Sequence, residues 1–125
     1  MASILIIGQN PDHIDPKDFP PGVTPDGIRA GLDASRGALV SKGHEVDVLL
    51  TTSAERIARE LADAVRRRHY DVLVIGAGLR VLPPFAEHFE RLMNAIREHA
   101  PSARLAFNTR PDDTAEAAER QLHAG

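Results

Sequence analysis

The sequence contains no cysteine. This absence excludes disulfide bonds, thiolate catalysis, CxxC redox chemistry and cysteine-ligated zinc. Aromatic residues make up only 4% of the chain, so we expect a core packed from Val, Ile, Leu and Ala. A basic excess is also missing, because the formal net charge is −3, and this argues against a nucleic-acid partner.

Long hydrophobic runs are absent as well. The apolar run at 4–7 is too short for a signal-peptide core or a membrane span, and no basic residue precedes it. We therefore expect a cytoplasmic protein without a membrane partner. The 125 residues, 42% hydrophobic and 26% charged, have the size and composition of one domain that covers residues 1–125.

Short apolar runs alternate with amphipathic stretches along the chain. Continuous runs at 4–7 and 72–75 predict central strands buried on both faces, whereas the mixed runs at 46–50 and 104–107 predict edge strands. Helices are expected at about 24–42, from 52 onward, from 83 to before 101 and from about 109 onward. These four strand–helix units predict an α/β fold of three layers, with an open parallel sheet in the order 2-1-3-4, flavodoxin-like or Rossmann-like.

Local signals mark the ends of these helices. Thr24 followed by Pro25 predicts a capped helix start, and Gly43 predicts where that helix stops. The stretch 52–55 reads as a capping box for the second helix, and 109–112 is a similar cap for the last one.

In open parallel sheets, ligands bind beyond the carboxyl ends of the strands, where the strand order reverses. Here that point lies between the first and third strands. The segments 8–13, 76–80 and 108–110 follow the first, third and fourth strands. They supply the residues that we predict to bind a ligand: Gln9, Asn10, Gly76, Gly78, Arg80, Asn108, Thr109 and Arg110.

These residue types suit polar or anionic ligands. The guanidinium groups of Arg80 and Arg110, with helix N-termini nearby, would suit a carboxylate or phosphate. They could equally pair with acids of the neighbouring loops. Asn10 and Asn108 could orient the ligand, or could hold the adjoining loops through side-chain to backbone bonds.

The loop after the first strand, 9–24, is unusually long. About fifteen residues separate strand from helix, where such loops usually hold two to six. Five of the nine prolines fall between positions 11 and 25, and proline lowers the entropic cost of ordering a loop. We interpret it as a lid or specificity loop, the alternative being a cover for apolar surface or a subunit contact.

Two histidines could transfer protons. His13 lies in this loop beside Asp12 and Asp15, where a carboxylate could orient its imidazole, and His88 lies in the third predicted helix. Either histidine could instead be a surface or capping residue. Asp12, His13 and His88 are the catalytic candidates. A metal site from Asp12, His13 and Asp15 matches no known ligand spacing, so no metal is expected.

Cofactor motifs are missing too. Residues 76–78 lack the third glycine of the dinucleotide fingerprint, and neither a Walker A sequence nor a GxSxG elbow occurs. Residues 9–11 do not resemble the hydroxyl-rich FMN loop of flavodoxins. Gly76 stands where response-regulator receivers carry their acidic phosphoacceptor. We expect no cofactor.

Two resemblances remain. The four-strand layout, with 71–76 leading to Leu79 and Arg80, is similar to small IIB-type phosphotransferase domains, but their phosphocysteine after the first strand is absent, which removes that activity. The stretches 19–24, 71–80 and 106–111 resemble uncharacterised short bacterial α/β proteins. That second resemblance covers most of the chain and implies the fold without any chemistry.

The sequence supports two functional hypotheses. The first is a site for an anionic or polar metabolite at the carboxyl edge of strands 1, 3 and 4, with cofactor-independent lyase, isomerase or hydrolase chemistry if the protein is an enzyme. The alternative is a non-catalytic regulatory or oligomerisation module. Its exposed edge strands and weakly apolar last helix would then be buried in a homodimer.

Overall fold

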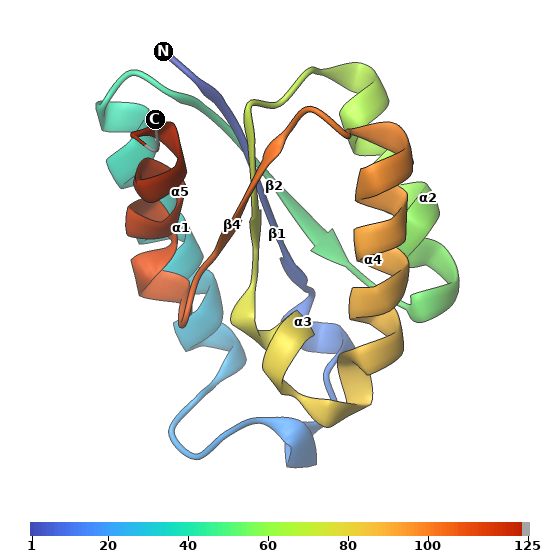
Figure 1. Ribbon diagram of the computed structural model, residues 1–125. Coiled ribbons are helices and arrows are strands. Elements are labelled where there is room, and N and C mark those ends of the chain that lie inside the picture. Colours follow the sequence, from blue (N-terminus) through green and yellow to red (C-terminus); the bar gives the residue numbers. More distant parts are fainter. Residues whose placement is uncertain (124–125) are drawn as a thin grey trace.

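The computed structural model describes residues 1–123 as a parallel four-stranded sheet between two layers of helices (Figure 1). The strands are β1 (Ser3–Gln9), β2 (Glu45–Thr51), β3 (Val72–Ile75) and β4 (Arg104–Phe107). Their order is β2-β1-β3-β4, which confirms the predicted α/β fold and strand order. In the register, Ile4 of β1 stands between Val46 of β2 and Val72 of β3.

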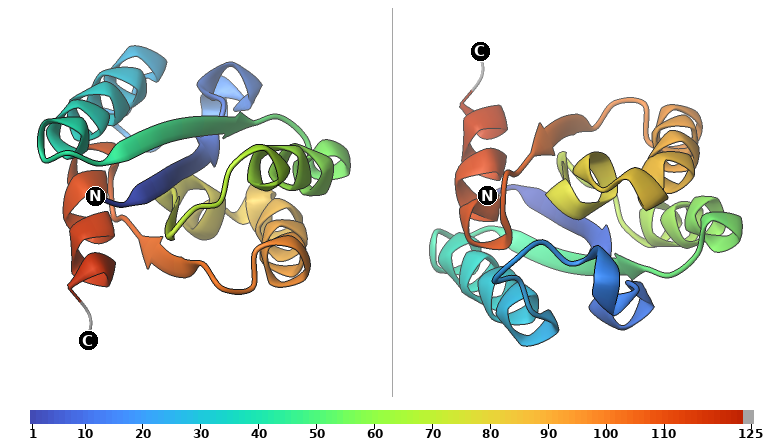
Figure 2. Two further views of the ribbon diagram at one scale, coloured as in Figure 1. Left: turned by 90° about the horizontal axis from the view of Figure 1, so that it is seen from above. Right: turned by 90° about the horizontal axis from the view of Figure 1, so that it is seen from below.

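The helices cover both faces of this sheet. They are α1 (Pro25–Ser41), α2 (Ala54–Arg67), α3 (Ala77–Val81), α4 (Ala86–His99) and α5 (Thr114–Leu122). Short 3-10 turns, η1 (Pro11–His13), η2 (Pro16–Asp18), η3 (Pro83–Phe85) and η4 (Pro111–Asp113), lie in the connections. Figure 2 shows α1 and α5 on one face and α2 and α4 on the other, while α3 lies at the carboxyl edge.

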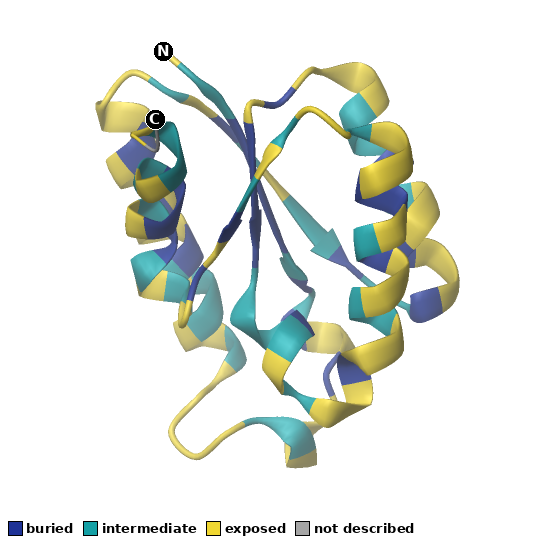
Figure 3. Ribbon diagram, viewed as in Figure 1, coloured by how far each residue is buried: buried dark blue, intermediate teal, exposed yellow. Residues whose placement is uncertain are grey.

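The alternation of strand side chains divides the core into two layers. Those that pack toward α2 and α4 are Leu5, Ile7, Leu73 and Ile75. Those that pack toward α1 and α5 are Ile4, Ile6, Val72 and Val74. Because β1 and β3 are covered on both faces, they are the most deeply buried segments in Figure 3. The edge strands β2 and β4 begin with exposed charged residues, Glu45 and Arg104.

The helix-end signals are confirmed in part. The hydroxyl of Thr24 accepts the N–H of Gly27 at 3.0 Å and caps α1, and Gly43 follows that helix with a φ of 90°, which glycine adopts without strain. The capping box predicted at 52–55 is wrong. The N-cap of α2 is Ser53, which makes no side-chain cap bond. The N–H and hydroxyl of Thr52 are bonded to the carboxylate of Glu60, at 3.2 and 3.0 Å.

The segment after β3 also departs from the sequence prediction. A short helix, α3, forms there, and α4 begins only at Ala86. Leu82 has extended backbone angles, as expected for a residue that precedes proline, and this separates the two helices. Gly76 lets the chain turn tightly beside β1, since a Cβ at this position would lie 3.2 Å from the carbonyl oxygen of Ile7. The last helix starts at Thr114, after η4, rather than near 109.

Candidate functional site

A pocket of about 190 Å³ opens at the carboxyl edge of the sheet, where β1 and β3 end side by side. This is the switch point at which the sequence predicts a site. The loop 10–24 forms one wall and the segment 108–111 another, with α1 and α3 between them. The lining residues from these elements are Ile6, Ile7, Gly8, Gln9, Ile14, Phe19, Pro20, Val23, Ile28, Leu32, Gly76, Ala77, Gly78, Val81, Leu82, Asn108, Thr109, Arg110 and Pro111.

The predicted site residues divide into two groups. Those that line the pocket are Gln9, Gly76, Gly78, Asn108, Thr109 and Arg110. Those outside the lining are Asn10, Asp12, His13, Arg80 and His88. The structure therefore brings the strand-end residues together and leaves the three catalytic candidates elsewhere.

Gln9 is a buried amide whose hydrogen-bonding capacity is used within the protein. Its Nε2 donates to the carbonyl oxygens of His13 at 3.2 Å and Thr52 at 2.7 Å. Its Oε1 accepts the hydroxyl proton of Thr51 at 2.9 Å. The side chain thus ties the end of β1 to β2 and to the start of the loop 10–24.

Asn108 does the same on the opposite wall. Its Oδ1 accepts the first N–H of α3, from Ala77, at 2.7 Å, and its Nδ2 donates to the hydroxyl of Thr114 at 2.9 Å. That hydroxyl in turn donates to the carbonyl oxygen of Pro111 at 2.7 Å. An amide fits here because one of its ends must accept and the other must donate. The sequence allowed Asn108 either to orient a ligand or to hold the adjoining loops, and these contacts hold the loops.

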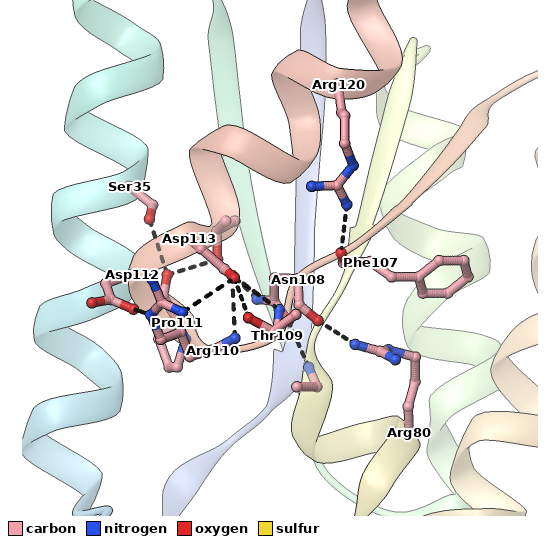
Figure 4. A network of polar contacts seen from close by, with 12 residues as sticks. Ser35, Arg80, Phe107, Asn108, Thr109, Arg110, Pro111, Asp112, Asp113 and Arg120 are labelled. Carbon is pink, nitrogen blue, oxygen red and sulfur yellow. Dashed lines mark hydrogen bonds and ion pairs between the residues drawn. The ribbon is translucent and has the colours of Figure 1, made fainter. Parts of the chain in front are cut away.

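The segment 109–113 folds around the carboxylate of Asp113 (Figure 4). This carboxylate accepts the N–H groups of Thr109 at 3.0 Å and Arg110 at 3.1 Å, and also the hydroxyl proton of Thr109. Burial alone would raise the pKa of Asp113, but these hydrogen bonds and the charge of Arg110 outweigh it and lower the pKa. The segment is therefore held in place by a carboxylate that stays ionised.

Arg110 is paired with two neighbouring carboxylates. Its Nε lies 2.7 Å from Asp112 Oδ1, and its Nη1 lies 3.9 Å from Asp113 Oδ2. The two acids outnumber the arginine on this rim. The sequence left open whether Arg110 binds a ligand or pairs with acids of the neighbouring loop, and in the structure it pairs with these acids.

Arg80 reaches from α3 to the end of β4, where its guanidinium points toward Asn108 (Figure 4). Its Nη2 donates to the carbonyl oxygen of Asn108, and its guanidinium carbon lies 5.1 Å from the ring centre of Phe107. The hydrogen bond supports the end of β4, and the guanidinium stacks on an aromatic ring, which is a favourable arrangement for arginine. Arg80 and Arg110 do not meet at a common rim.

The first turn of the loop 10–24 is organised around Arg29 of α1. The Oδ1 of Asn10 accepts the N–H of Asp12 at 2.9 Å and a proton of Arg29 at 3.3 Å, and Asp12 forms an ion pair with Arg29 at 3.1 Å. Asp12 therefore pairs with an arginine and not with His13. Within residues 1–123, the exposed imidazole of His13 makes no hydrogen bond or ion pair, so no carboxylate orients it.

His88 packs between helices instead of facing the pocket. Its ring meets that of Phe85 edge-on, with the centroids 4.7 Å apart. Desolvation by burial lowers its pKa, against the opposing effect of the carboxylates of Glu55 and Glu87. The imidazole is thus neutral at pH 7, and its buried Nδ1 has no hydrogen-bond partner within the described residues.

The apolar side of the pocket was missed by reasoning from the sequence. Ile28 and Leu32 of α1, together with Phe19 and Val23 of the loop, form much of it. Two signals were available: the spacing of four residues between Ile28 and Leu32, which places both on one helix face, and apolar residues in a loop rich in proline. Neither signal entered the predicted site, which was built from residues at the strand ends.

Residues 1–123 contain neither a cluster of metal-ligating side chains nor a helix that could span a membrane. No three acidic or histidine side chains among them come together to hold a metal ion, so Asp12, His13 and Asp15 do not form such a site. None of the helices in this range has both the length and the apolar character needed to cross a membrane.

The sheet order and the pocket at its switch point define a three-layer α/β protein. No protein-family model matches the chain, and no curated protein matches it. Among solved structures, it is similar to a "putative lipoprotein from Peptoclostridium difficile 630 (fragment)", with a TM-score of 0.57 and 10% sequence identity over 98% of this chain and 95% of that chain. At this identity, the likeness shows the fold alone.

Proposed function

We propose that this protein binds a small molecule in the pocket at the carboxyl edge of the sheet and does not transform it. The proposal rests on the apolar character of the residues that line the pocket. A volume of about 190 Å³ is bounded mainly by aliphatic and aromatic side chains, and Arg110 is the titratable residue among the described lining residues. Small-molecule pockets are typically apolar with a few polar groups at their margin.

The positions of the catalytic candidates favour binding over catalysis. A general acid or base must come within hydrogen-bond reach of the proton that it transfers. Asp12 is paired with Arg29, His88 is packed against Phe85, and neither these residues nor His13 lines the pocket. Ligand sensing or carriage fits this arrangement better than lyase, isomerase or hydrolase chemistry.

A homodimer through the edge strands stays a prediction. At the end of β4, the carbonyl oxygen of Phe107 already accepts a proton from Arg120 at 3.0 Å. This bond occupies a group that a partner strand would need, so an added strand along β4 is less favoured than the small-molecule pocket.

The proposal is tested with a glycine of the pocket wall. A Cβ on Gly78 would meet no atom within 4 Å, so Gly78→Leu adds a side chain in open space beside the pocket. Gly37→Leu is the matched control. It places the same side chain on α1, also without a neighbour within 4 Å, at a residue outside the lining.

The measurement is an NMR screen of small fragments with neutral, anionic and cationic members. We expect hits that shift the methyl signals of Ile28 and Leu32, and we expect Gly78→Leu to remove them while Gly37→Leu retains them. A screen without such hits, or hits that Gly78→Leu leaves unchanged, would refute the proposed function.

A further inference from the structure

The shape and size of the pocket restrict its ligand. Its apolar residues come from three directions: β1 with Ile6, α1 with Leu32, and the loop with Phe19. An apolar cavity of about 150 Å³ in another protein is large enough for benzene. A volume of about 190 Å³ therefore fits a molecule of one ring, or of two small fused rings.

The amides of the pocket offer little to a polar ligand. Both Nε2 protons of Gln9 are donated to backbone carbonyls, and both ends of Asn108 are engaged with α3 and Thr114. A ligand that recruited these groups would have to break bonds that hold the two walls. Unpaired buried polar groups are costly, so these amides act as structure and not as ligand contacts.

The charge at the rim does not favour an anion. Arg110 carries the positive charge of the lining, and Asp112 and Asp113 stand at 2.7 and 3.9 Å from its guanidinium nitrogens. The formal charges of these three side chains at neutral pH sum to −1. A carboxylate ligand would meet an arginine that is already neutralised.

We infer that the ligand of this pocket is an uncharged, compact apolar molecule with one or two rings. This inference rests on the proposed function and narrows it. It replaces the anionic or polar metabolite that the two arginines suggested in the sequence. The bound molecule contacts apolar side chains on three sides, and no charge compensation is required.

The test compares uncharged with anionic probes of matched size. Toluene and indole represent the inferred class, and benzoate is the anionic counterpart of toluene. We expect toluene or indole to raise the Tm by about 5 °C at ten times its Kd, with benzoate at the same concentration giving no shift. Arg110→Gln should leave the binding of the uncharged probes within about twofold of wild type, because the arginine is not needed for them.

The outcomes separate this inference from the function on which it rests. If benzoate binds more tightly than toluene and Arg110→Gln abolishes its binding, the pocket is an anion site and the inference is wrong while the proposed function stands. If none of the three probes shifts the Tm or the methyl signals of Ile28 and Leu32, and the wider fragment screen is also empty, both fail. Binding of toluene or indole that survives Arg110→Gln and is lost in Gly78→Leu supports both.

Discussion

Two walls of the same pocket are held in different ways. The segment 108–113, after β4, is fastened by a buried amide and by a carboxylate with three bonds to it from the segment itself. The first turn of the loop 10–24, after β1, is fastened to α1 by the pair of Asp12 and Arg29, whose side chains are 70% and 39% exposed. Buried hydrogen bonds cost more to break than exposed ion pairs. Gln9 and the buried Ile14 also hold the start of this loop. We therefore call 108–113 the fixed wall and expect the rest of the loop, the movable wall, to open at the lower cost.

The loop 10–24 keeps its shape largely through its own backbone. Residues 20–23 form a turn in which the N–H of Val23 donates to the carbonyl oxygen of Pro20 at 3.1 Å, and Gly22 has a φ of 81°. Pro21 followed by Gly22 is the sequence that such a type II turn requires. Prolines restrict the unfolded chain, so the loop is ordered without many long-range bonds. A lid over a ligand site benefits from this combination.

Removing one amide from each wall should give the largest difference. Asn108→Ala leaves the N–H of Ala77 without its acceptor and removes the buried bond that the hydroxyl of Thr114 accepts, and we expect a loss of about 3 kcal/mol in the free energy of unfolding. Asn10→Ala removes the cap of η1 at a more exposed position, with an expected loss of about 1 kcal/mol. Urea unfolding of the two variants measures both losses.

Thr109→Ala serves as a further reference, since it removes only the hydroxyl bond to Asp113 and keeps both backbone bonds. Equal losses for Asn108→Ala and Asn10→Ala would contradict the prediction and would mean that the two walls are held equally firmly.

The sequence was informative about these walls to different extents. The strand order and the switch point follow from the apolar runs at 4–7 and 72–75, because continuous burial requires a central position. The hydrogen bonds of Asn108 could not be predicted, since they depend on where α3 begins, and α3 itself was not foreseen. The pairing of Asp12 with Arg29 was also missed, because it joins residues seventeen positions apart across a loop whose path the sequence leaves open.

A second test uses the carboxylate that holds the fixed wall. Asp113→Ala removes the bonds to the N–H groups of Thr109 and Arg110, and we expect a loss of about 2 kcal/mol at pH 7. Because the folded protein lowers the pKa of Asp113, its contribution is present at neutral pH and is lost as the pH falls below the ordinary aspartate range. Unfolding curves from pH 7 to pH 2 should therefore converge for wild type and variant at the acid end. A constant gap between the curves would contradict this assignment.

His88 lies outside both walls of the pocket and should make the free energy of unfolding depend on pH. Its pKa is lowered in the folded protein, so the unfolded chain binds the proton more readily and stability falls as the pH drops below the ordinary histidine range. His88→Phe, which keeps a ring against Phe85, should flatten the change in unfolding free energy between pH 7.5 and pH 5. The effect should be smaller than that of Asp113→Ala. An unchanged slope would show that the imidazole titrates as it does in water.

The smallest change in stability is expected at the movable wall itself. Asp12→Ala removes an exposed ion pair, so the free energy of unfolding should change by less than about 0.5 kcal/mol. Hydrogen exchange of the backbone amides between 12 and 19 should nevertheless become about twofold faster, because the pair fastens that turn to α1.

Asp63→Ala is the matched control for this experiment. It breaks an ion pair of the same length, 3.1 Å, between Asp63 and Arg66 on α2, whose residues do not line the pocket. It should leave exchange in the loop 10–24 unchanged. If Asp12→Ala speeds exchange in 108–113 as much as in the loop, the walls open together, and the pocket is then better described as a single unit than as a fixed frame with a lid.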